Sequence, residues 1–364
     1  MNVVVVGGGP AGAMCALMLA RGGASVSLVH WDGYSSDGVE LVSGRARRTI
    51  ERHSPDFFRR VAPGVEVHET ISLWGTPEPV TLSAMFNPWG AGMAVERGLF
   101  DQALRNMAGA AGVSVIADTK VMDIERRDDQ WQLSMRSAGT RSAETGSNPV
   151  CARFLVLATG RASTLFLDRS PVTESSQVAL MASLPTQHDE PVPHMPNELP
   201  NELPNEALNH TLYVEAMDNG WWYALPARDG GHFAGFCISR DEIRRRQATL
   251  REFFVRELDR TRLLAPSMSS RAYNLRITGR TADAVAFSRM AGNGWIAVGD
   301  AAYAPDPLSG MGIELAIESA QLGATALLAA AQHNAMPEFA EYEDAIRKRA
   351  SQHGKTAAHH YGRL

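Results

Sequence analysis

The sequence predicts an α/β protein in which a Rossmann-like dinucleotide-binding domain is joined to a substrate domain with a mixed or antiparallel sheet. Three observations predict this fold class. An apolar strand over residues 3–6 runs into a glycine-rich loop that opens a helix. Near the other end of the chain, a strand ending in Gly299-Asp300 precedes a long apolar helix over about 313–331. Between them, alternating residues such as 211–215 are typical of antiparallel strands.

The first element is the strand, loop and helix at the amino terminus. The loop residues that carry its motif are Gly7, Gly9, Pro10, Ala11 and Gly12. Gly7 permits the tight turn, Gly9 lets backbone N–H groups approach a pyrophosphate, and Gly12 lets the helix lie close to the strand. The helix N-terminus is directed at the anion. Together with a second apolar strand over 26–29, this arrangement predicts a dinucleotide-binding site.

The second strand ends in His30, where a Glu or Asp would usually bind the ribose hydroxyls. A neutral imidazole accepts one hydrogen bond, whereas a carboxylate accepts two or more. We therefore expect His30 to contact the dinucleotide with lower affinity than a carboxylate would give. Asp32 is the alternative ribose ligand.

The segment over 294–302 and the loop that follows it resemble the flavoprotein monooxygenase family with the hydroxybenzoate hydroxylase fold, and in particular its halogenase-like branch. The resemblance implies that the dinucleotide is FAD and that Asp300 binds its ribityl chain. It also implies that the loop over 307–312 places backbone N–H groups and a helix N-terminus beside the flavin pyrimidine edge. The cofactor-binding residues expected in this part of the chain are Gly299, Asp300, Pro307, Gly310, Met311 and Gly312.

Three further segments are similar to the same family. The stretch 44–48 matches a region whose arginines reach the FAD pyrophosphate, here Arg45 and Arg47, and Glu40 matches a Glu of the halogenase-like members. Arg97 opens an Arg-x-x-Phe-Asp element whose arginine lies near the flavin in that family. The apolar strand over 154–160 ends at Gly160, where the family's chain returns to the nucleotide. Taken singly, the arginines also fit solvated helix charges, and the strand fits an ordinary buried strand.

Composition narrows the function classes. The net charge of −5 and the lack of a basic stripe argue against a nucleic-acid partner. The three cysteines, Cys15, Cys151 and Cys237, are scattered without metal-ligand spacing, so we expect no metal site and free thiols in a reducing compartment. We also expect no apolar stretch long enough to span a bilayer and no basic amphipathic helix for a membrane surface. A cytoplasmic protein without membrane partners is the resulting expectation.

The motif positions predict the domain organisation. The FAD-binding domain takes 1–60, 95–165 and 285–330, and the substrate domain takes 61–94 and 166–284. A C-terminal helical region over 331–364, with charges on one face, is expected to be solvated. Within the substrate domain, the insert 185–209 repeats Pro-Asn-Glu-Leu, which favours a flexible surface loop. That insert is either a duplication without a role or a lid or docking loop.

The segment Trp221-Trp222-Tyr223 is similar to the Trp-x-Trp-x-Ile-Pro signature of flavin-dependent halogenases. The resemblance implies that these three aromatic side chains wall the substrate pocket over the flavin. An aromatic run of this kind also fits an ordinary strand core, and we leave both interpretations open.

Two absences argue against halogenation. Flavin-dependent halogenases carry an essential lysine near the end of the first βαβ region, whereas this chain has only Lys120, Lys348 and Lys355, none in that context. Tryptophan halogenases also place a Glu at the position of Ser309. The remaining reaction is flavin-dependent hydroxylation of an aromatic substrate. No catalytic base is evident. Tyr223 and His210 are the candidates, and for His210 a solvated side chain is the alternative.

The substrate is predicted only by resemblance. Among the short halogenase-like members are maturation flavoproteins that modify a peptidyl tryptophan during cysteine tryptophylquinone biogenesis. This likeness implies a precursor quinoprotein amino-acid oxidase as the partner. The alternatives are a small-molecule aromatic hydroxylase of secondary metabolism, a flavin-binding partner protein without turnover, and a lipid-reducing flavoprotein. Electrons would come from NAD(P)H or from a separate reductase.

Overall fold

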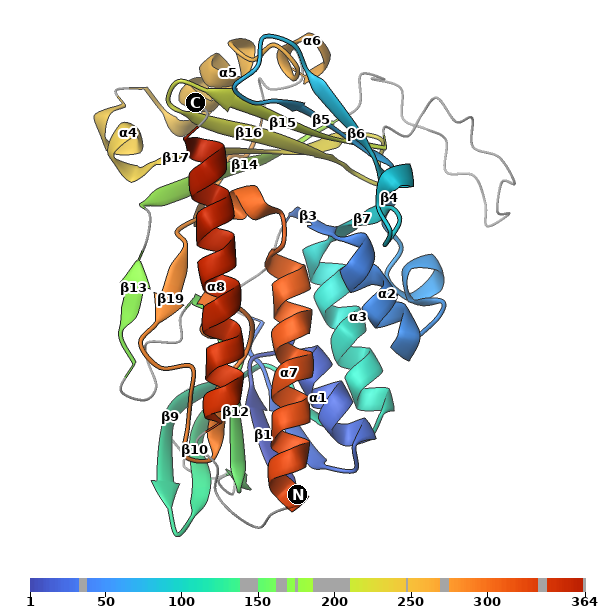
Figure 1. Ribbon diagram of the computed structural model, residues 1–364, viewed down its shortest axis with the longest axis vertical. Helices are drawn as coiled ribbons and strands as arrows, with labels where there is room; N and C mark the ends of the chain where they lie inside the picture. Colours follow the sequence, from blue (N-terminus) through green and yellow to red (C-terminus); the bar gives the residue numbers. More distant parts are fainter. Residues whose placement is uncertain are drawn as a thin grey trace.

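A computed structural model describes residues 1–32, 38–137, 150–161, 169–173, 176–185, 210–246, 248–268, 275–332 and 339–362. Two larger sheets organise it, one at each end of the molecule, with smaller sheets between and beside them (Figure 1). Apart from Pro185, the predicted insert 185–209 lies outside the described residues.

A six-stranded sheet forms the core of the cofactor-binding end. Its strands, in order across the sheet, are β20 (Ala291–Gly292), β21 (Trp295–Ala297), β12 (Phe154–Leu157), β1 (Asn2–Val6), β2 (Ser25–Val29) and β8 (Ser114–Ile116). All neighbouring pairs are parallel except β20 with β21. The central strands β1 and β12 have no exposed apolar residue, because helices and other elements cover both faces of such a sheet.

Three long helices accompany this sheet: α1 (Pro10–Arg21), α3 (Arg97–Ala110) and α7 (Gly312–Gln332). Helix α1 packs against both of the others. The expectation that no apolar stretch could span a bilayer needs a correction at α7. By length and composition this helix is apolar enough to cross a membrane, with a mean hydropathy of 1.3 over its most apolar window. However, 61% of that window is buried inside the protein, so its apolar residues serve the core.

The second large sheet has seven strands. In order they are β18 (Thr278–Thr281), β14 (Gln177–Leu184), β17 (His232–Ser239), β16 (Gly220–Pro226), β15 (Thr211–Met217), β5 (Glu69–Leu73) and β6 (Val80–Ser83). Only β15 and β5 pair in parallel, and the other pairs are antiparallel. One face packs on the helices α4 (Arg240–Arg245), α5 (Leu250–Asp259) and α6 (Ala265–Met268). The other face meets Val39 and Val65 of a smaller sheet and Leu308 of the loop before α7.

Smaller elements lie between and beside the two ends (Figure 1). The three-stranded sheets are β3-β7-β4 (Val39–Val42, Gly92–Glu96, Val65–Val67), β11-β10-β9 (Val150–Ala152, Gln130–Ser137, Thr119–Arg127) and β13-β19-β22 (Pro171–Thr173, Val285–Phe287, Tyr303–Ala304). The short helices are α2 (Gly44–His53), a π-helix over Phe57–Val61 and 3₁₀ turns over Ala84–Phe86, Gly299–Ala301 and Pro307–Ser309.

The C-terminal helix α8 (Ala340–Tyr361) runs along the molecule to the seven-stranded sheet, where the chain ends (Figure 1). The expectation of a solvated helix holds for the charged residues Glu341, Arg347 and Lys348, which are exposed, but the opposite face of the helix packs on the protein. Tyr342 and Ile346 are buried, the Tyr342 hydroxyl donates to the carbonyl oxygen of Ala297, and Glu343 Oε2 accepts from the backbone N–H groups of Met290 and Ala291 at 3.1 Å each. Helix α8 therefore clamps the edge of the six-stranded sheet.

The predicted fold class is confirmed. The strands expected at 3–6 and 26–29 and the helix expected at about 313–331 are present with bounds that differ by one residue. The strand expected over 154–160 is also present, but it ends three residues earlier, at Leu157. The domain boundaries stay predictions.

Candidate functional site

The turn after β1 holds the predicted pyrophosphate loop against the end of β12. Gly7 has a φ of +113°, and a Cβ there would lie 2.1 Å from the carbonyl oxygen of Ala158. A Cβ on Gly12 would lie 1.9 Å from the carbonyl oxygen of Gly7. By contrast, a Cβ on Gly9 would meet no atom within 4 Å. Gly7 and Gly12 are therefore required for packing, whereas Gly9 borders open space at the N-terminus of α1.

His30 is buried beside this loop, with Nδ1 3.2 Å from Asp32 Oδ1. Burial and the charge of Arg105 lower the pKa of His30, so the imidazole is neutral near pH 7. Sequence reasoning missed Arg105, whose Nη1 donates to the carbonyl oxygen of Gly8 at 3.2 Å and whose Nη2 lies 3.5 Å from Asp32. The available signal was its spacing, because Arg97, Asp101 and Arg105 follow each other at intervals of four on α3.

Arg97 lies in a partly buried network with two carboxylates. Its Nη1 donates to Glu40 at 2.7 Å, and its Nε and Nη2 donate to the two carboxylate oxygens of Asp101 at 3.1 and 3.0 Å. Burial opposes the charge, but Glu40 and Asp101 more than compensate and raise the pKa of Arg97. The guanidinium therefore stays charged. Its contact with the flavin stays a prediction.

The two arginines predicted to reach the pyrophosphate are separated. Arg45 lies at the first turns of α7, 3.4 Å from Glu314 and 3.7 Å from Glu318, which keeps it near the loop over 307–312. Arg47 points elsewhere, with its Nε 3.0 Å from Glu51 and its Nη1 2.6 Å from Glu66 of β4. Two carboxylates hold Arg47, so the structure does not support a pyrophosphate role for it.

Asp300 follows β21 at a left-handed glycine turn. Gly299 has a φ of +63°, and its N–H donates to Ser319 Oγ at 2.8 Å. Three residues after the neighbouring strand β12, Gly160 also has a positive φ, and Arg161 Nε lies 3.2 Å from Asp300 Oδ2. Adjacent parallel strands thus bring Gly160 and Asp300 together, as expected for the carboxyl edge of such a sheet. Arg161 was not predicted, although it directly follows the Ala-Thr-Gly motif.

Replacing Asp300 with asparagine is expected to raise the melting temperature of the FAD-free protein at pH 7. Burial raises the pKa of Asp300 above 3.8, although Arg161 opposes the shift. The folded state therefore binds the Asp300 proton more tightly than the unfolded chain does. The wild type loses stability as the pH rises through the raised pKa of Asp300, because the buried carboxylate then has to carry a charge. Thermal unfolding of both proteins between pH 4 and 8 measures the difference between their melting temperatures, which should become smaller toward pH 4. A gap independent of pH would contradict this account.

The loop after Asp306 presents backbone donors to the same region. Asp306 Oδ1 accepts from the N–H of Leu308 at 2.9 Å, and Gly310 adopts a φ of +59°. Ser309, in the position where tryptophan halogenases have a Glu, accepts from the N–H of Met311 at 3.3 Å. Helix α7 begins at Gly312, so the loop from Pro307 ends at a helix N-terminus.

Trp221 and Tyr223 lie on the sheet face that meets this loop. Both belong to the apolar cluster that contains Leu308. The centroids of their rings are 5.9 Å apart. Gly235, on the neighbouring strand, leaves room for Tyr223, because a Cβ there would lie 2.2 Å from the ring. Burial raises the pKa of Tyr223, so its hydroxyl stays protonated and is unsuited to act as a general base.

Tyr361 of α8 joins this aromatic face, which no sequence motif indicated. Its hydroxyl accepts from Trp221 Nε1 at 3.2 Å and from Gln177 Nε2 at 3.2 Å, and it donates to Asp306 Oδ1 at 3.1 Å. The Tyr361 hydroxyl therefore uses both of its acceptor positions and its one proton. Tyr361 links the seven-stranded sheet to the loop that begins at Asp306.

The other two side chains predicted here lie elsewhere, which is a correction. Trp222 points to the opposite face of the sheet, where it stacks on Phe236 at 4.6 Å between ring centroids and is fully buried. His210 Nδ1 contacts the carbonyl oxygen of Glu66 at 2.7 Å. Tyr223 pairs with Val214, four residues along β15 from His210, which is about 13 Å. Trp222 therefore does not line the pocket, and His210 and Tyr223 do not converge.

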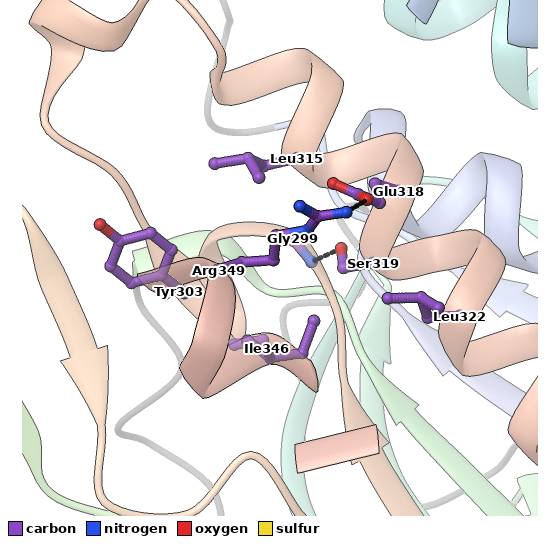
Figure 2. Close-up of a pocket in the computed structure, with 9 residues that line it drawn as sticks. Gly299, Tyr303, Leu315, Glu318, Ser319, Leu322, Ile346 and Arg349 are labelled. Carbon is purple, nitrogen blue, oxygen red and sulfur yellow. Dashed lines mark hydrogen bonds and ion pairs between the residues drawn. The ribbon is translucent and has the colours of Figure 1, made fainter. Parts of the chain in front are cut away.

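A small pocket lies between α7 and α8 beside the Gly299 turn (Figure 2). Its lining includes Tyr303, Leu315, Leu322 and Ile346, and an ion pair joins Glu318 to Arg349 across it. The only predicted cofactor residue in the lining is Gly299, whose N–H is already bound to Ser319. The pocket therefore lies beside the turn that carries Asp300 and does not coincide with the predicted cofactor-binding residues.

Comparison with known proteins identifies a family. The model of FAD dependent oxidoreductases matches residues 2–198, which is 197 of the 364 residues. A protein of Marinomonas mediterranea described as an FAD-dependent oxidoreductase, LodB, is 26% identical over 88% of this chain and 82% of its own. A tryptophan 2-halogenase of Chondromyces crocatus is 26% identical over 90% of this chain and 60% of its own.

Two solved structures share the fold. The peptidyl tryptophan dihydroxylase QhpG, described as essential for tryptophylquinone cofactor biogenesis, has a TM-score of 0.75 and 24% identity, covering 99% of this chain and 75% of its own. The myxobacterial chondrochloren halogenase CndH has a TM-score of 0.79 and 22% identity, covering 99% and 82%.

The residues present fit FAD. Gly9 borders open space at a helix N-terminus, which suits a pyrophosphate. Thr159 Oγ1, next to Gly160, is buried and has no hydrogen-bond partner within the described part of the chain. Asp300 keeps 35% of its side chain exposed despite its position at the carboxyl edge of the sheet. A bound dinucleotide would provide hydrogen-bond partners for the backbone N–H groups at this helix N-terminus, for the Thr159 hydroxyl and for the Asp300 carboxylate.

Proposed function

Because the chain belongs to the family of FAD-dependent oxidoreductases, we propose that it is a flavin monooxygenase that hydroxylates an aromatic ring, with a tryptophan side chain of a partner protein as substrate. The observation that carries the proposal is the aromatic face of Trp221, Tyr223 and Tyr361 against the loop over 306–312. An apolar wall with few polar groups suits an uncharged aromatic ring such as indole and disfavours a charged substrate.

The reaction is balanced as follows. One oxygen atom of O₂ is inserted into an aromatic C–H bond and the other leaves as water; NAD(P)H or a separate reductase supplies two electrons, and two protons come from the donor and the solvent. FAD, when bound, supplies the oxygen-transfer chemistry. Asp300 and the N–H groups at the N-terminus of α7 would hold and orient it. The aromatic face orients the ring and excludes water, and the protonated Tyr223 serves as a hydrogen-bond donor.

The position of the lysines favours hydroxylation over halogenation. Lys120 Nζ lies 5.0 Å from the centroid of the Trp31 ring, on β9 at the cofactor-binding end. Lys348 and Lys355 are exposed on α8.

The peptidyl substrate is supported by the match to QhpG, which extends over 99% of this chain. A match at 24% identity establishes the fold, so the substrate is our inference. The proposal includes a precursor quinoprotein oxidase as the partner and the cytoplasm as the location, since all three cysteines are free thiols.

Co-expression with a tryptophylquinone precursor oxidase tests the proposal. Mass spectrometry of the precursor should show one or two added oxygen atoms on a single tryptophan, and the Asp300→Ala variant should show none. An unmodified tryptophan beside an FAD-loaded protein would contradict the proposal. Hydroxylation of a free aromatic compound alone would instead indicate a small-molecule hydroxylase. A flavin that NADH and dithionite both fail to reduce would indicate a binding protein without turnover.

A further inference from the structure

Within the described part of the chain, the seven-stranded sheet ends in a short edge strand that lacks the charges and internal proline that commonly protect such an edge. Strand β6 pairs only with β5 among the described strands, and all four of its residues are exposed. Edge strands of soluble proteins commonly carry charges, bulges or internal proline, which block pairing with another chain. Strand β6 has none of these, and Pro79 only precedes it. From Ile71 to Val95, 25 residues, Glu78 alone is ionisable, whereas 21% charged residues in the chain would give about five.

Exposed apolar side chains gather on the same stretch. We define the apolar edge as Val80, Leu82, Met85, Phe86 and Trp89. Leu82 is 63% exposed, and Met85 and Phe86 are 86% exposed. These five make up the majority of the nine large exposed apolar side chains in the described residues, although they span only ten positions. Single exposed apolar residues are ordinary, but a cluster of this kind marks a binding surface.

The apolar edge continues into the aromatic site. Val80 pairs with Ser72, Ser72 with Val214, and Val214 with Tyr223, so all four side chains lie on one face of the sheet. Three strand spacings, about 14 Å, separate Val80 from Tyr223. At the other end of the edge, the Trp89 ring lies under the Arg45 guanidinium at 5.7 Å, beside the first turn of α7.

We propose that the apolar edge docks an extended, uncharged segment of the partner protein that carries the substrate tryptophan, with this segment pairing along the open side of β6. The inference rests on the proposed function and names how the partner is held. An added strand satisfies the unpaired backbone N–H and C=O groups of an edge, which a small aromatic molecule or a lipid surface leaves unpaired. A segment paired with β6 lies one strand spacing further out, about 19 Å from Tyr223, a distance that about six further residues of extended chain would span.

The test measures peptide binding without turnover. The probe is a fluorescein-labelled peptide, Gly-Thr-Val-Thr-Trp-Thr-Val-Thr-Gly, titrated with the FAD-loaded protein and followed by fluorescence anisotropy. Leu82→Lys and Phe86→Lys should each weaken binding at least tenfold. The matched control is Met122→Lys, because Met122 is also apolar and 47% exposed but lies on β9, in the other part of the molecule. It should change binding less than twofold, and all three variants should keep the wild-type melting temperature.

Four results would overturn the docking proposal: no binding of the peptide to the wild type, equal weakening in Met122→Lys, binding that requires deletion of residues 186–209, or a wild-type dimer that Leu82→Lys converts to a monomer in sedimentation velocity. The third would assign the apolar edge to the chain's own insert, and the fourth to a second copy. Binding is measured without a reductant, so it does not depend on turnover. A peptide that binds but stays unmodified when dithionite-reduced, FAD-loaded protein is mixed with O₂ would count against the proposed function alone.

Discussion

The Gly12→Ala variant is expected to purify without FAD and to unfold with a free energy lower by about 3 kcal/mol or more. Alanine is favoured over glycine inside a helix by about 1 kcal/mol, which would stabilise α1. The added Cβ, however, would lie 1.9 Å from the carbonyl oxygen of Gly7 and 2.9 Å from Ala158 Cβ. Backbone atoms at that distance have to move, so the steric cost exceeds the gain in helix propensity. Denaturant unfolding and the flavin absorbance of the purified protein measure both effects.

Gly9→Ala is the matched control for cofactor binding. Gly9 has a φ of −74°, which alanine adopts without strain, and its Cβ would meet no protein atom. The FAD-free variant should therefore match the wild type in stability, while the methyl group occupies space that a pyrophosphate needs and weakens FAD binding at least tenfold. Unchanged FAD affinity in Gly9→Ala would show that the pyrophosphate does not lie on this loop.

Local patterns in the sequence predicted the cofactor-binding end well. Gly12 contacts Gly7, which is close to it in the chain, and Gly7 contacts Ala158, which follows the adjacent parallel strand. The glycine spacing in the sequence reflects these close contacts. The Gly-Asp turn at Asp300 is local in the same sense. Such patterns can be read from the sequence because the backbone conformation that they require is set within a few residues.

Contacts between distant segments were not predicted. Arg161 and Asp300 are 139 positions apart, and Tyr361 is 140 positions from Trp221. Neither spacing leaves a periodic signal, and the charged residues of α8 indicated a solvated helix although the helix clamps a sheet edge. The pairing of Arg47 with Glu51, by contrast, follows the four-residue spacing of a helix, and this signal pointed away from the pyrophosphate.

Trp221 and Trp222 are expected to respond in opposite ways to substitution, because a strand directs successive side chains to opposite faces. Trp222→Ala should lower the free energy of unfolding by about 3–5 kcal/mol, since the ring is fully buried between Phe236 and Phe254. The protein that remains folded should keep the wild-type KM for its aromatic substrate.

Trp221→Phe should instead retain most of the stability and lose activity. It removes the Nε1 donor to Tyr361, and with it one connection between the seven-stranded sheet and the loop at Asp306. We expect at least a tenfold fall in kcat/KM and a loss of unfolding free energy near 1 kcal/mol, the usual value of one hydrogen bond. Steady-state kinetics measure kcat/KM and KM of the two variants, and denaturant unfolding measures their free energies of unfolding. If Trp222→Ala changed KM while Trp221→Phe did not, the aromatic face assigned to the site would be on the wrong side of the sheet.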